Sequence, residues 1–312
     1  MSKFQKIIDY ALHSPDKLLL AILVRMAPII PDRLYLKWLF RLKMGYKLNL
    51  DNPQTFNEKL QWLKLYNRRP EYTKMVDKFA VKEYVAKIIG EEYIIPTLGV
   101  WDKFEDIDFD ALPNQFVLKT THGGGGGGVV ICRDKSKFDV QAAKIKLDKS
   151  LKQCIYKSLK EWPYKDVPRR IIAEKYMVDK VTEDNPYGDL IDYKLYCFNG
   201  CVKVCMLATE RFSETGVCFD YFDREFNHYP FSQGGPNSKK SIERPELLDE
   251  MIDIATKLSA GMPHVRVDLY CVDKRIYFGE LTLFDSSGFA EFNPAKWDYT
   301  FGCWIELPKR HI

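Results

Sequence analysis

The sequence predicts an α+β protein, because helical and strand signals occupy different parts of the chain. Apolar residues recur at helical spacing through much of residues 3–89, whereas β-branched and alternating runs dominate from residue 170. Six consecutive glycines, Gly123 to Gly128, lie between two strand-like segments. The chain has no internal repeat and no long linker, so we expect these elements to build one α+β arrangement.

The expected elements follow in order along the chain. Helices are predicted at residues 3–66 (with breaks at Pro28, Pro31 and Pro53), 71–89, 136–155 and 245–260. Strands are predicted at residues 115–119, 129–132, 170–177, 191–198, 202–208, 217–222, 264–272 and 275–282. Ser136 is the expected N-cap of its helix. Asn199-Gly200 and Asp273-Lys274 are expected two-residue hairpin turns.

Composition indicates a globular protein with reduced thiols. The 312 residues are 46% hydrophobic and 14% aromatic, enough for a large core and one to three domains. The eight cysteines lie mostly in apolar strand-like runs, with no Cys-x-x-Cys pair and no signal peptide before them. We therefore expect a cytoplasmic protein with neither disulfides nor a zinc site.

The first 50 residues are basic. They carry nine basic and three acidic residues, a net charge of +6 in a chain whose total is +4. The apolar stretches 18–24 and 34–40 are each shorter than the roughly 18 residues that span a bilayer. Such a segment suits reversible attachment to the inner face of a membrane or to an acidic glycan. The alternative is a helical cap on the core, which Tyr35, Trp38 and Leu39 favour.

The glycine run offers many backbone N–H groups to a ligand, and Lys119 just before it adds a point charge suited to phosphate. We therefore expect a nucleotide triphosphate beneath a flexible glycine flap. A dinucleotide fingerprint needs a helix after the glycines, but the strand-like Val129-Val-Ile-Cys132 follows; a P-loop needs Gly-Lys-Ser/Thr. Protein-kinase motifs are absent downstream. A mobile linker is the alternative.

Charged and hydroxyl side chains recur two residues apart on the later strands, and residues at i and i+2 share one face of a strand. These pairs are Asp192 with Lys194, Arg266 with Asp268, and Glu280 with Thr282. Across the Asp273-Lys274 hairpin, Asp268 and Glu280 would face each other and hold magnesium. Each pair alone is typical of an exposed sheet face. Together, beside a glycine flap, they predict a nucleotide site.

In this order the motifs resemble the ATP-grasp superfamily, specifically its TupA-like branch, which is associated with bacterial surface-polysaccharide loci. The resemblance runs from about Leu48 to the C-terminus. It is carried by Thr55-Phe-Asn-Glu-Lys59, Val76-Asp-Lys78, Phe116-Val-Leu-Lys119-Thr-Thr-His122-Gly, Ala173-Glu-Lys-Tyr176, Asp192-Tyr-Lys194-Leu-Tyr-Cys-Phe-Asn-Gly200, Arg266-Val-Asp268-Leu-Tyr and Gly279-Glu-Leu-Thr282. It implies an ATP-grasp fold, in which two α+β subdomains clasp ATP. The expected division is a helical region at 1–70, a flap-bearing subdomain at 71–170 and a metal-binding subdomain at 171–312.

The resemblance implies a role for each matching residue. Phosphate contacts would come from Lys78, Lys119 and Lys194, and Arg266 with Lys194 would stabilise the transferring phosphoryl group. ATP would also be held by His122, Gly123, Gly124, Gly125 and Gly126 of the flap and by Glu174, Lys175 and Tyr176 of the hinge. The magnesium ligands would be Asp268, Glu280 and Thr282. The superfamily usually has asparagine at the position of Thr282, whose hydroxyl ligates magnesium more weakly.

The reaction implied is ATP-dependent activation of a carboxylate. An acyl phosphate forms, and an amine then displaces phosphate to give an amide. The TupA-like branch is similar to enzymes that attach amino acids or other amines to uronic acids of capsular or cell-wall glycans. No nucleic-acid partner is expected. Ser286, Ser287 and Gly288 would meet the acceptor carboxylate, or form a simple turn.

Two other classes stay open. An inactive nucleotide-binding protein of the same pathway would keep the fold without turnover. A glycosyltransferase would use a nucleotide sugar and commonly an Asp-x-Asp metal motif, a pattern that Asp106-Ile-Asp108-Phe-Asp110 satisfies. These aspartates lie in an acidic connection ahead of Pro113, which favours a solvated loop.

Overall fold

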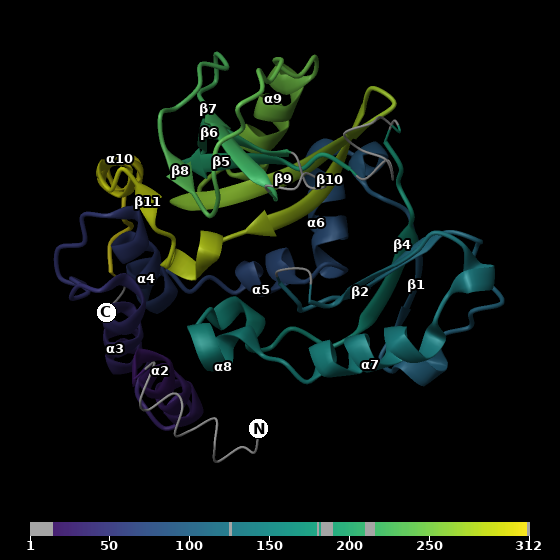
Figure 1. Cartoon of the computed structure of the whole chain (residues 1–312), viewed down its shortest axis with the longest axis horizontal. Coiled ribbons are helices and arrows are strands. Elements are labelled where there is room, and N and C mark those ends of the chain that lie inside the picture. Colours follow the sequence, from purple (N-terminus) through teal and green to yellow (C-terminus); the bar gives the residue numbers. More distant parts are fainter. Residues whose placement is uncertain (1–14, 125–126, 180, 182–189, 210–215, 311–312) are drawn as a thin grey trace.

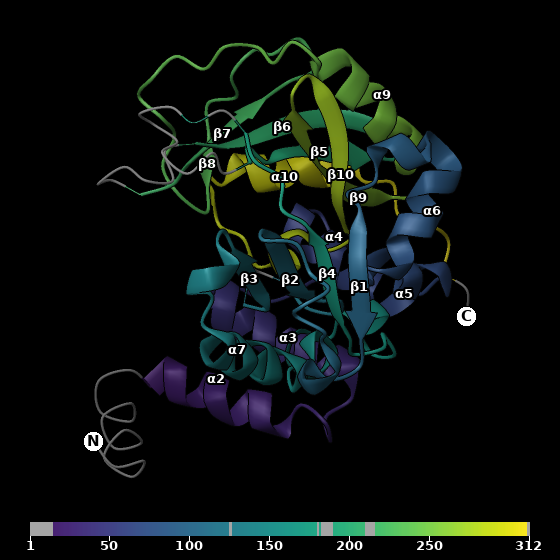
Figure 2. The same ribbon diagram turned by 90° about the vertical axis from the view of Figure 1, so that its right-hand side faces the viewer.

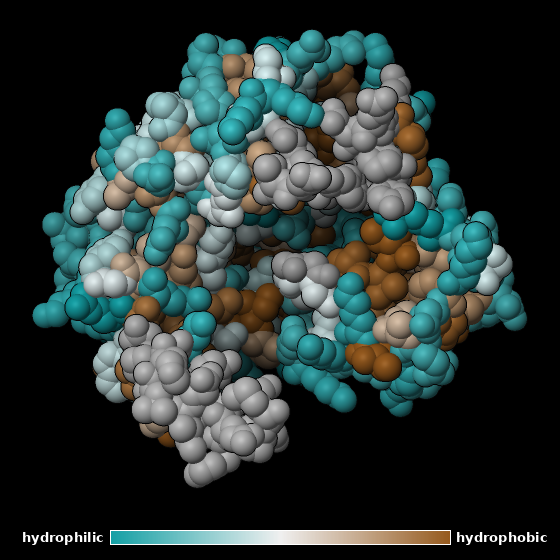
Figure 3. Space-filling view, in the orientation of Figure 1, coloured by the Kyte–Doolittle hydropathy of each residue, from teal (hydrophilic) through white to brown (hydrophobic). Residues whose placement is uncertain are grey.

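The computed structural model describes residues 15–124, 127–179, 181, 190–209 and 216–310. Two antiparallel sheets, each with helices packed on it, form two lobes (Figure 1), which confirms the predicted α+β class. The surface is hollowed between the lobes (Figure 3). None of the described helices is long and apolar enough to cross a bilayer.

The smaller lobe is built on a four-stranded sheet with the order β1-β4-β2-β3. Its strands are β1 (Thr97–Trp101), β2 (Phe116–Thr120), β3 (Val129–Cys132) and β4 (Ile171–Lys175). Alternating burial along β2 places Phe116 and Leu118 in a core covered by α7 (Val140–Leu151). The glycine run therefore joins two paired strands, β2 and β3, as predicted.

The larger lobe is built on a five-stranded sheet with the order β10-β9-β5-β6-β7. Its strands are β5 (Tyr193–Phe198), β6 (Cys201–Thr209), β7 (Cys218–Phe222), β9 (His264–Val272) and β10 (Arg275–Thr282). Both predicted hairpin turns form, because Asn199-Gly200 and Asp273-Lys274 have φ between 49° and 78°. Helix α9 (Leu248–Leu258) packs its apolar face on this sheet. A short two-stranded sheet of β8 (Ser232–Gln233) and β11 (Phe292–Asn293) lies next to β7.

The N-terminal helices are α2 (Pro15–Met26), α3 (Asp32–Met44) and α4 (Phe56–Tyr66). Helix α4 begins at a capping box, in which the side chains of Thr55 and Glu58 accept each other's backbone N–H. It packs against α10 (Lys296–Trp304) near the other end of the chain. The helical region is thus tied to the larger lobe. Residues 3–14 of the predicted helical segment lie outside the described residues.

The single helix predicted at 71–89 is two helices, α5 (Glu71–Val76) and α6 (Ala80–Ile89). The chain is extended at Asp77, whose carboxylate accepts the N–H of Phe79 at 2.9 Å. An aspartate that bonds its own neighbouring backbone competes with the helix ladder, and here it breaks the helix.

The expected N-cap at Ser136 is wrong. Ser136 lies in a short 3-10 turn, and its N–H donates to the side chain of Asp134. Asp139 caps α7 instead, accepting from the Ala142 N–H at 2.9 Å. The helix ends at Leu151, and a separate helix α8 (Ile155–Leu159) follows.

Strand β4 leads from one lobe to the other. It completes the smaller sheet by pairing with both β1 and β2. The predicted division at residue 170 falls just before this strand, whose partners lie in the preceding segment. After Lys175 the chain crosses to β5, so the end of β4 faces the space between the lobes (Figure 2).

Candidate active site between the two sheets

Charged side chains line up on three adjacent strands of the larger sheet. Lys194 on β5 pairs in register with Asp268 on β9, which pairs in turn with Glu280 on β10. A bulge at Gly279, where the register shifts by one residue, produces the second pairing. Cross-strand partners point to the same face of a sheet, so the three side chains form one row.

Arg266 holds the carboxylates of this row together. Its guanidinium contacts both oxygens of Asp268, each at 2.7 Å, and Glu280 Oε1 at 3.3 Å. It also pairs with Asp285. Lys194 Nζ lies 2.6 Å from Asp268 Oδ2, and the Asp268 side chain is only 2% exposed. A deeply buried carboxylate is therefore neutralised by two cations, as burial requires.

The donor atoms of the row suit a small hard cation. Asp268, Glu280 and Thr282 offer only oxygen, which Mg²⁺ prefers, and Thr282 Oγ1 lies 3.1 Å from Glu280 Oε1. Burial raises the pKa of Glu280, but Lys78, Arg266 and Lys194 outweigh it and lower that pKa to about 2. Within the described residues no three His, Cys, Asp or Glu side chains converge on a cation site. These oxygens therefore lie near one another, but in the described residues they do not already form a closed cation site.

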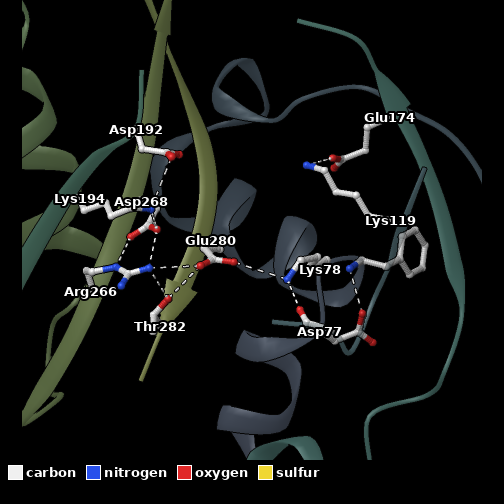
Figure 4. A network of polar contacts seen from close by, with 12 residues as sticks. Asp77, Lys78, Lys119, Glu174, Asp192, Lys194, Arg266, Asp268, Glu280 and Thr282 are labelled. Carbon is white, nitrogen blue, oxygen red and sulfur yellow. Dashed lines mark hydrogen bonds and ion pairs between the residues drawn. The ribbon is translucent and has the colours of Figure 1, made fainter. Parts of the chain in front are cut away.

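Two lysines surround one carboxylate, Glu174, on the opposite side of the gap, and Figure 4 shows one of them, Lys119. Glu174 on β4 lies 2.7 Å from Lys119 Nζ and 2.5 Å from Lys82 Nζ, and its side chain is 7% exposed. Lys82 on α6 also donates to the Ile95 carbonyl at 2.7 Å. Burial opposes ionisation of Glu174, but the two lysines outweigh it and lower its pKa. Glu174 is therefore a buried anion balanced by two cations.

Lys78 bridges the two sides, as Figure 4 shows. It lies in the corner between α5 and α6, where its N–H donates to the Thr121 carbonyl at 2.9 Å. Its Nζ donates to the Gly123 carbonyl at 2.6 Å and lies 3.5 Å from Glu280 Oε2. We refer to Asp268, Glu280 and Thr282 of the larger sheet as the acid row. Lys78 thus contacts both the start of the glycine segment and, through Glu280, the acid row.

The order and geometry of these residues agree with a match to a family model. The model described as "TupA-like ATPgrasp" matches residues 58–306. The chain belongs to the TupA-like ATPgrasp family. The predicted ATP-grasp fold is thereby confirmed. A comparison with curated proteins finds no match.

Solved structures of ATP-grasp proteins are similar to this TupA-like protein at low identity. D-alanine–D-alanine ligase from Bacillus anthracis is 18% identical over 67% of this chain and 57% of that chain, with a TM-score of 0.36. The Helicobacter pylori ligase is 13% identical over 80% and 69%, with a TM-score of 0.40. A RimK domain ATP-grasp protein from Sphaerobacter thermophilus DSM 20745 is 12% identical over 77% and 70%, with a TM-score of 0.40. The chain therefore spans little more than half of the Bacillus anthracis ligase.

The flap of this TupA-like protein starts directly after β2. Gly123 and Gly124 are described, whereas Gly125 and Gly126 lie outside the described residues. A Cβ at Gly128 would lie 2.2 Å from the side chain of Thr120, so the flap requires glycine where it returns to the sheet. His122 is buried, and its ring nitrogens have no hydrogen-bond partner in the described part of the chain. Burial lowers the pKa of His122, which favours a neutral ring.

The chain leaves the smaller sheet after Lys175, the last residue of β4. The Lys175 N–H donates to the Pro96 carbonyl at 3.0 Å, while the Lys175 side chain is exposed. The Tyr176 hydroxyl accepts from Arg133 Nε at 3.1 Å. The three predicted hinge residues, Glu174, Lys175 and Tyr176, therefore lie at the end of β4 or directly after it, where the chain leaves the sheet.

Only one of the three residues predicted to meet the acceptor is exposed. Ser286, Ser287 and Gly288 all have positive φ, and Ser286 is exposed while the other two are buried. The Ser287 hydroxyl donates to Glu161 and accepts from Lys64 Nζ at 3.1 Å. Burial lowers the pKa of Lys64 to about 7. The turn is thus anchored from inside the protein, with Ser286 at its tip.

Two members of the site were missed from the sequence, Lys82 and Asp285. A lysine on a short helix and an aspartate in a turn are ordinary surface patterns, and only tertiary pairing with Glu174 and Arg266 distinguishes them. The Asp-x-Asp pattern, in contrast, forms a local turn in the smaller lobe. The Asp108 carboxylate there accepts the N–H of Asp110 at 3.0 Å.

Proposed function

We propose that the protein is an ATP-dependent carboxylate–amine ligase that forms an amide through an acyl phosphate. Its substrates would be an amino acid or other small amine and a uronic acid of a bacterial surface polysaccharide. The observation that carries the proposal is the Lys78 bridge, because it joins the glycine flap to the acid row in one site. Membership of the TupA-like ATPgrasp family supports the use of ATP.

Cations from both lobes would hold the nucleotide. Lys78, Lys119 and Lys194 would neutralise phosphate charge, and backbone N–H groups of the flap would cover it. The hinge at residues 174–176 and His122 would contact the remainder of ATP. Since Lys119 and Lys194 are bound to carboxylates in this structure, the nucleotide phosphates would compete for them.

The acid row would hold the metal. Asp268, Glu280 and Thr282 would bind Mg²⁺, which would neutralise charge on the transferring phosphate. Arg266 would stabilise the same phosphoryl group from within the row. Its contact with Asp285 would keep the guanidinium in place when the other carboxylates turn toward the cation.

Phosphoryl transfer and amide formation would both proceed without a covalent bond between substrate and protein. An oxygen of the acceptor carboxylate would attack the γ-phosphorus, and the bond to the bridging oxygen would break with its electrons on ADP. The amine would then attack the acyl carbon and lose a proton to solvent, while the carbon–oxygen bond to phosphate breaks. Ser286, exposed at the tip of its turn, would meet the acceptor. We place this reaction in the cytoplasm, where ATP is made, at the inner face of the membrane.

A coupled screen tests the proposal. The purified full-length protein is incubated with Mg-ATP, a panel of uronic acids and a panel of amino acids, and ADP, phosphate and product mass are measured. We expect ADP and phosphate to rise only when acid and amine are both present, with the amide detected by its mass. Nucleotide binding without acceptor-dependent ADP would indicate the inactive binding protein. Release of UDP from a nucleotide sugar would indicate the glycosyltransferase.

A further inference from the structure

Helix α2 leaves much of its apolar surface exposed. Leu23 is 6% exposed and packs in the core. Leu19, Ile22 and Met26, in contrast, are between 42% and 51% exposed. Their spacing places them on one face of the helix, and Ile29, 76% exposed, follows just beyond its end. We refer to Leu19, Ile22, Met26 and Ile29 as the α2 stripe.

The surroundings of the α2 stripe are cationic. Residues 17–47 contain seven basic residues and a single acid, Asp32. That acid is neutralised by other parts of the chain, since Arg68 lies 2.8 Å and Lys160 3.1 Å from its oxygens. Lys17 and Arg25 are exposed on α2 itself. Arg33 in turn pairs with Asp51 at 3.0 Å, and α2 also contains Asp16, so the segment keeps a smaller but still positive net charge.

The stripe lies at one end of the molecule. In Figures 1 and 2, α2 is at the opposite end from α9 and projects from the body of the protein. Helix α3 beside it adds Leu34, 41% exposed, and Trp38, 48% exposed. Tryptophan is enriched where proteins meet the headgroup region of a membrane. An extended surface can thus reach this end without contacting the larger lobe.

We propose that the α2 stripe and its basic neighbours dock the protein on an anionic lipid bilayer. Helix α2 has 12 residues, about 18 Å, against roughly 30 Å of hydrocarbon, so it would lie in the plane of the interface. The apolar side chains would enter the headgroup boundary, and the cations would bind anionic headgroups. An acidic glycan would bind the cations but leave the stripe in water, so the exposed apolar residues favour lipid.

Co-sedimentation of the full-length protein with vesicles tests this proposal. We expect binding to phosphatidylcholine vesicles that contain phosphatidylglycerol, weakened by salt, and little binding to phosphatidylcholine alone. Replacing Ile22→Ser and Ile29→Ser together should lower vesicle affinity about tenfold, because two side chains lose their apolar burial. The matched control is Ile145→Ser on α7, an isoleucine 69% exposed, which should leave affinity unchanged.

Three results would overturn the docking surface. One is equal vesicle binding by the double variant and the wild type. Another is an equal loss in the Ile145→Ser control. The third is salt-sensitive binding to a uronic-acid polymer with none to anionic vesicles, which would make the segment a glycan site. ADP formation with soluble acceptor should be unchanged in every variant, so a failure of docking is distinct from a failure of the ligase proposal.

Discussion

The two sheets meet across the site with opposite charge. The side of the smaller sheet has three lysines and one carboxylate: Lys82 and Lys119 pair with Glu174, and Lys78 reaches Glu280 of the other sheet. The larger sheet has four carboxylates around two cations: Asp192, Asp268, Glu280, Asp285, Lys194 and Arg266. One side is therefore suited to phosphate and the other to a metal ion, and a magnesium–nucleotide complex requires both.

Each side also combines a buried carboxylate with a more exposed group. Asp268 and Glu174 are 2% and 7% exposed, whereas Glu280 and Lys119 are 39% and 23% exposed and point into the gap. A buried charge that loses its partner is costly, while an exposed one is cheap to release. The comparison teaches that substitutions of the buried acids should affect folding and function, and those of the exposed groups mainly function.

The largest effect is expected for Asp268→Asn. Arg266 and Lys194 would lose their shared carboxylate, so the free energy of unfolding should fall by about 3–5 kcal/mol. Turnover should fall roughly 10²–10³-fold, because the variant removes a magnesium ligand. Denaturant unfolding and ADP release measure the two effects. Asp192→Asn is the control, since Asp192 lies 3.8 Å from Lys194, whereas Asp268 lies 2.6 Å from it and also binds Arg266. Wild-type magnesium dependence in Asp268→Asn would contradict the metal site.

Lys119→Met should separate nucleotide binding from stability. ATP affinity should fall about 10²-fold, since a phosphate contact is lost. The thermal midpoint of the apo protein should change little, because Lys82 still neutralises Glu174 at 2.5 Å. Lys82→Met should show the reverse, with a lower midpoint and a smaller loss of affinity. If the two variants behave alike in calorimetry and nucleotide titration, the distinction between buried and exposed groups fails.

Glu280→Gln should raise the magnesium requirement about tenfold and change the response to acid. The pKa of Glu280 is lowered from 4.5 to about 2, so its contribution to stability is present above pH 4.5 and is lost as the pH falls toward 2. The variant lacks this titration, and its stability should fall less between pH 4.5 and 2. Urea unfolding across this range measures the difference. Parallel pH profiles of variant and wild type would show that Glu280 is not ionised by its three cations.

The smallest effect is expected for Thr282→Asn, which tests how strongly residue 282 contributes to magnesium binding. Thr282 Oγ1 lies 3.1 Å from Glu280 Oε1, and an amide oxygen there would be a stronger magnesium ligand than a hydroxyl. The magnesium concentration for half-maximal rate should fall about threefold, with stability within about 0.5 kcal/mol of the wild type. Thr282→Val, which removes the hydroxyl at similar volume, should move the requirement in the opposite direction.

Local signals predicted much of the larger sheet. The Asn199-Gly200 and Asp273-Lys274 turns specify their hairpins through positive φ, and the predicted strands 264–272 and 275–282 are β9 and β10. The helix break at Asp77 was not predicted, because an aspartate within an apolar helical pattern carries no sign of where its carboxylate points. Similarly, Asp139 and Ser136 are both good capping residues, and only the structure distinguishes them.

The pairing of Lys82 with Glu174 could not be read from the sequence, because 92 positions separate the two residues and their contact depends on how α6 packs beside β4. The roles of Lys78 and Arg266 come from the family resemblance, the role of Lys119 comes also from its place before the glycine run, and all three stay predictions. Their proximity is a property of the fold, since these residues come from a helix corner, the smaller sheet and the larger sheet.

Whether Glu280 lies opposite Asp268 depends on the bulge at Gly279. Val272 pairs with Arg275 across the Asp273-Lys274 turn, and uninterrupted pairing from there would place Gly279 opposite Asp268. Glu280 would then point to the other face of the sheet, since neighbouring residues of a strand alternate. Deleting Gly279 would move Glu280 into the position opposite Asp268 without a bulge, so the two acids would still pair. Loss of the bulge with Gly279 kept would instead separate Glu280 from Asp268, although every acid stays in the sequence. A homologous chain is therefore comparable at this site by the register of its two strands, since either a bulge or a strand one residue shorter keeps the second acid opposite the first.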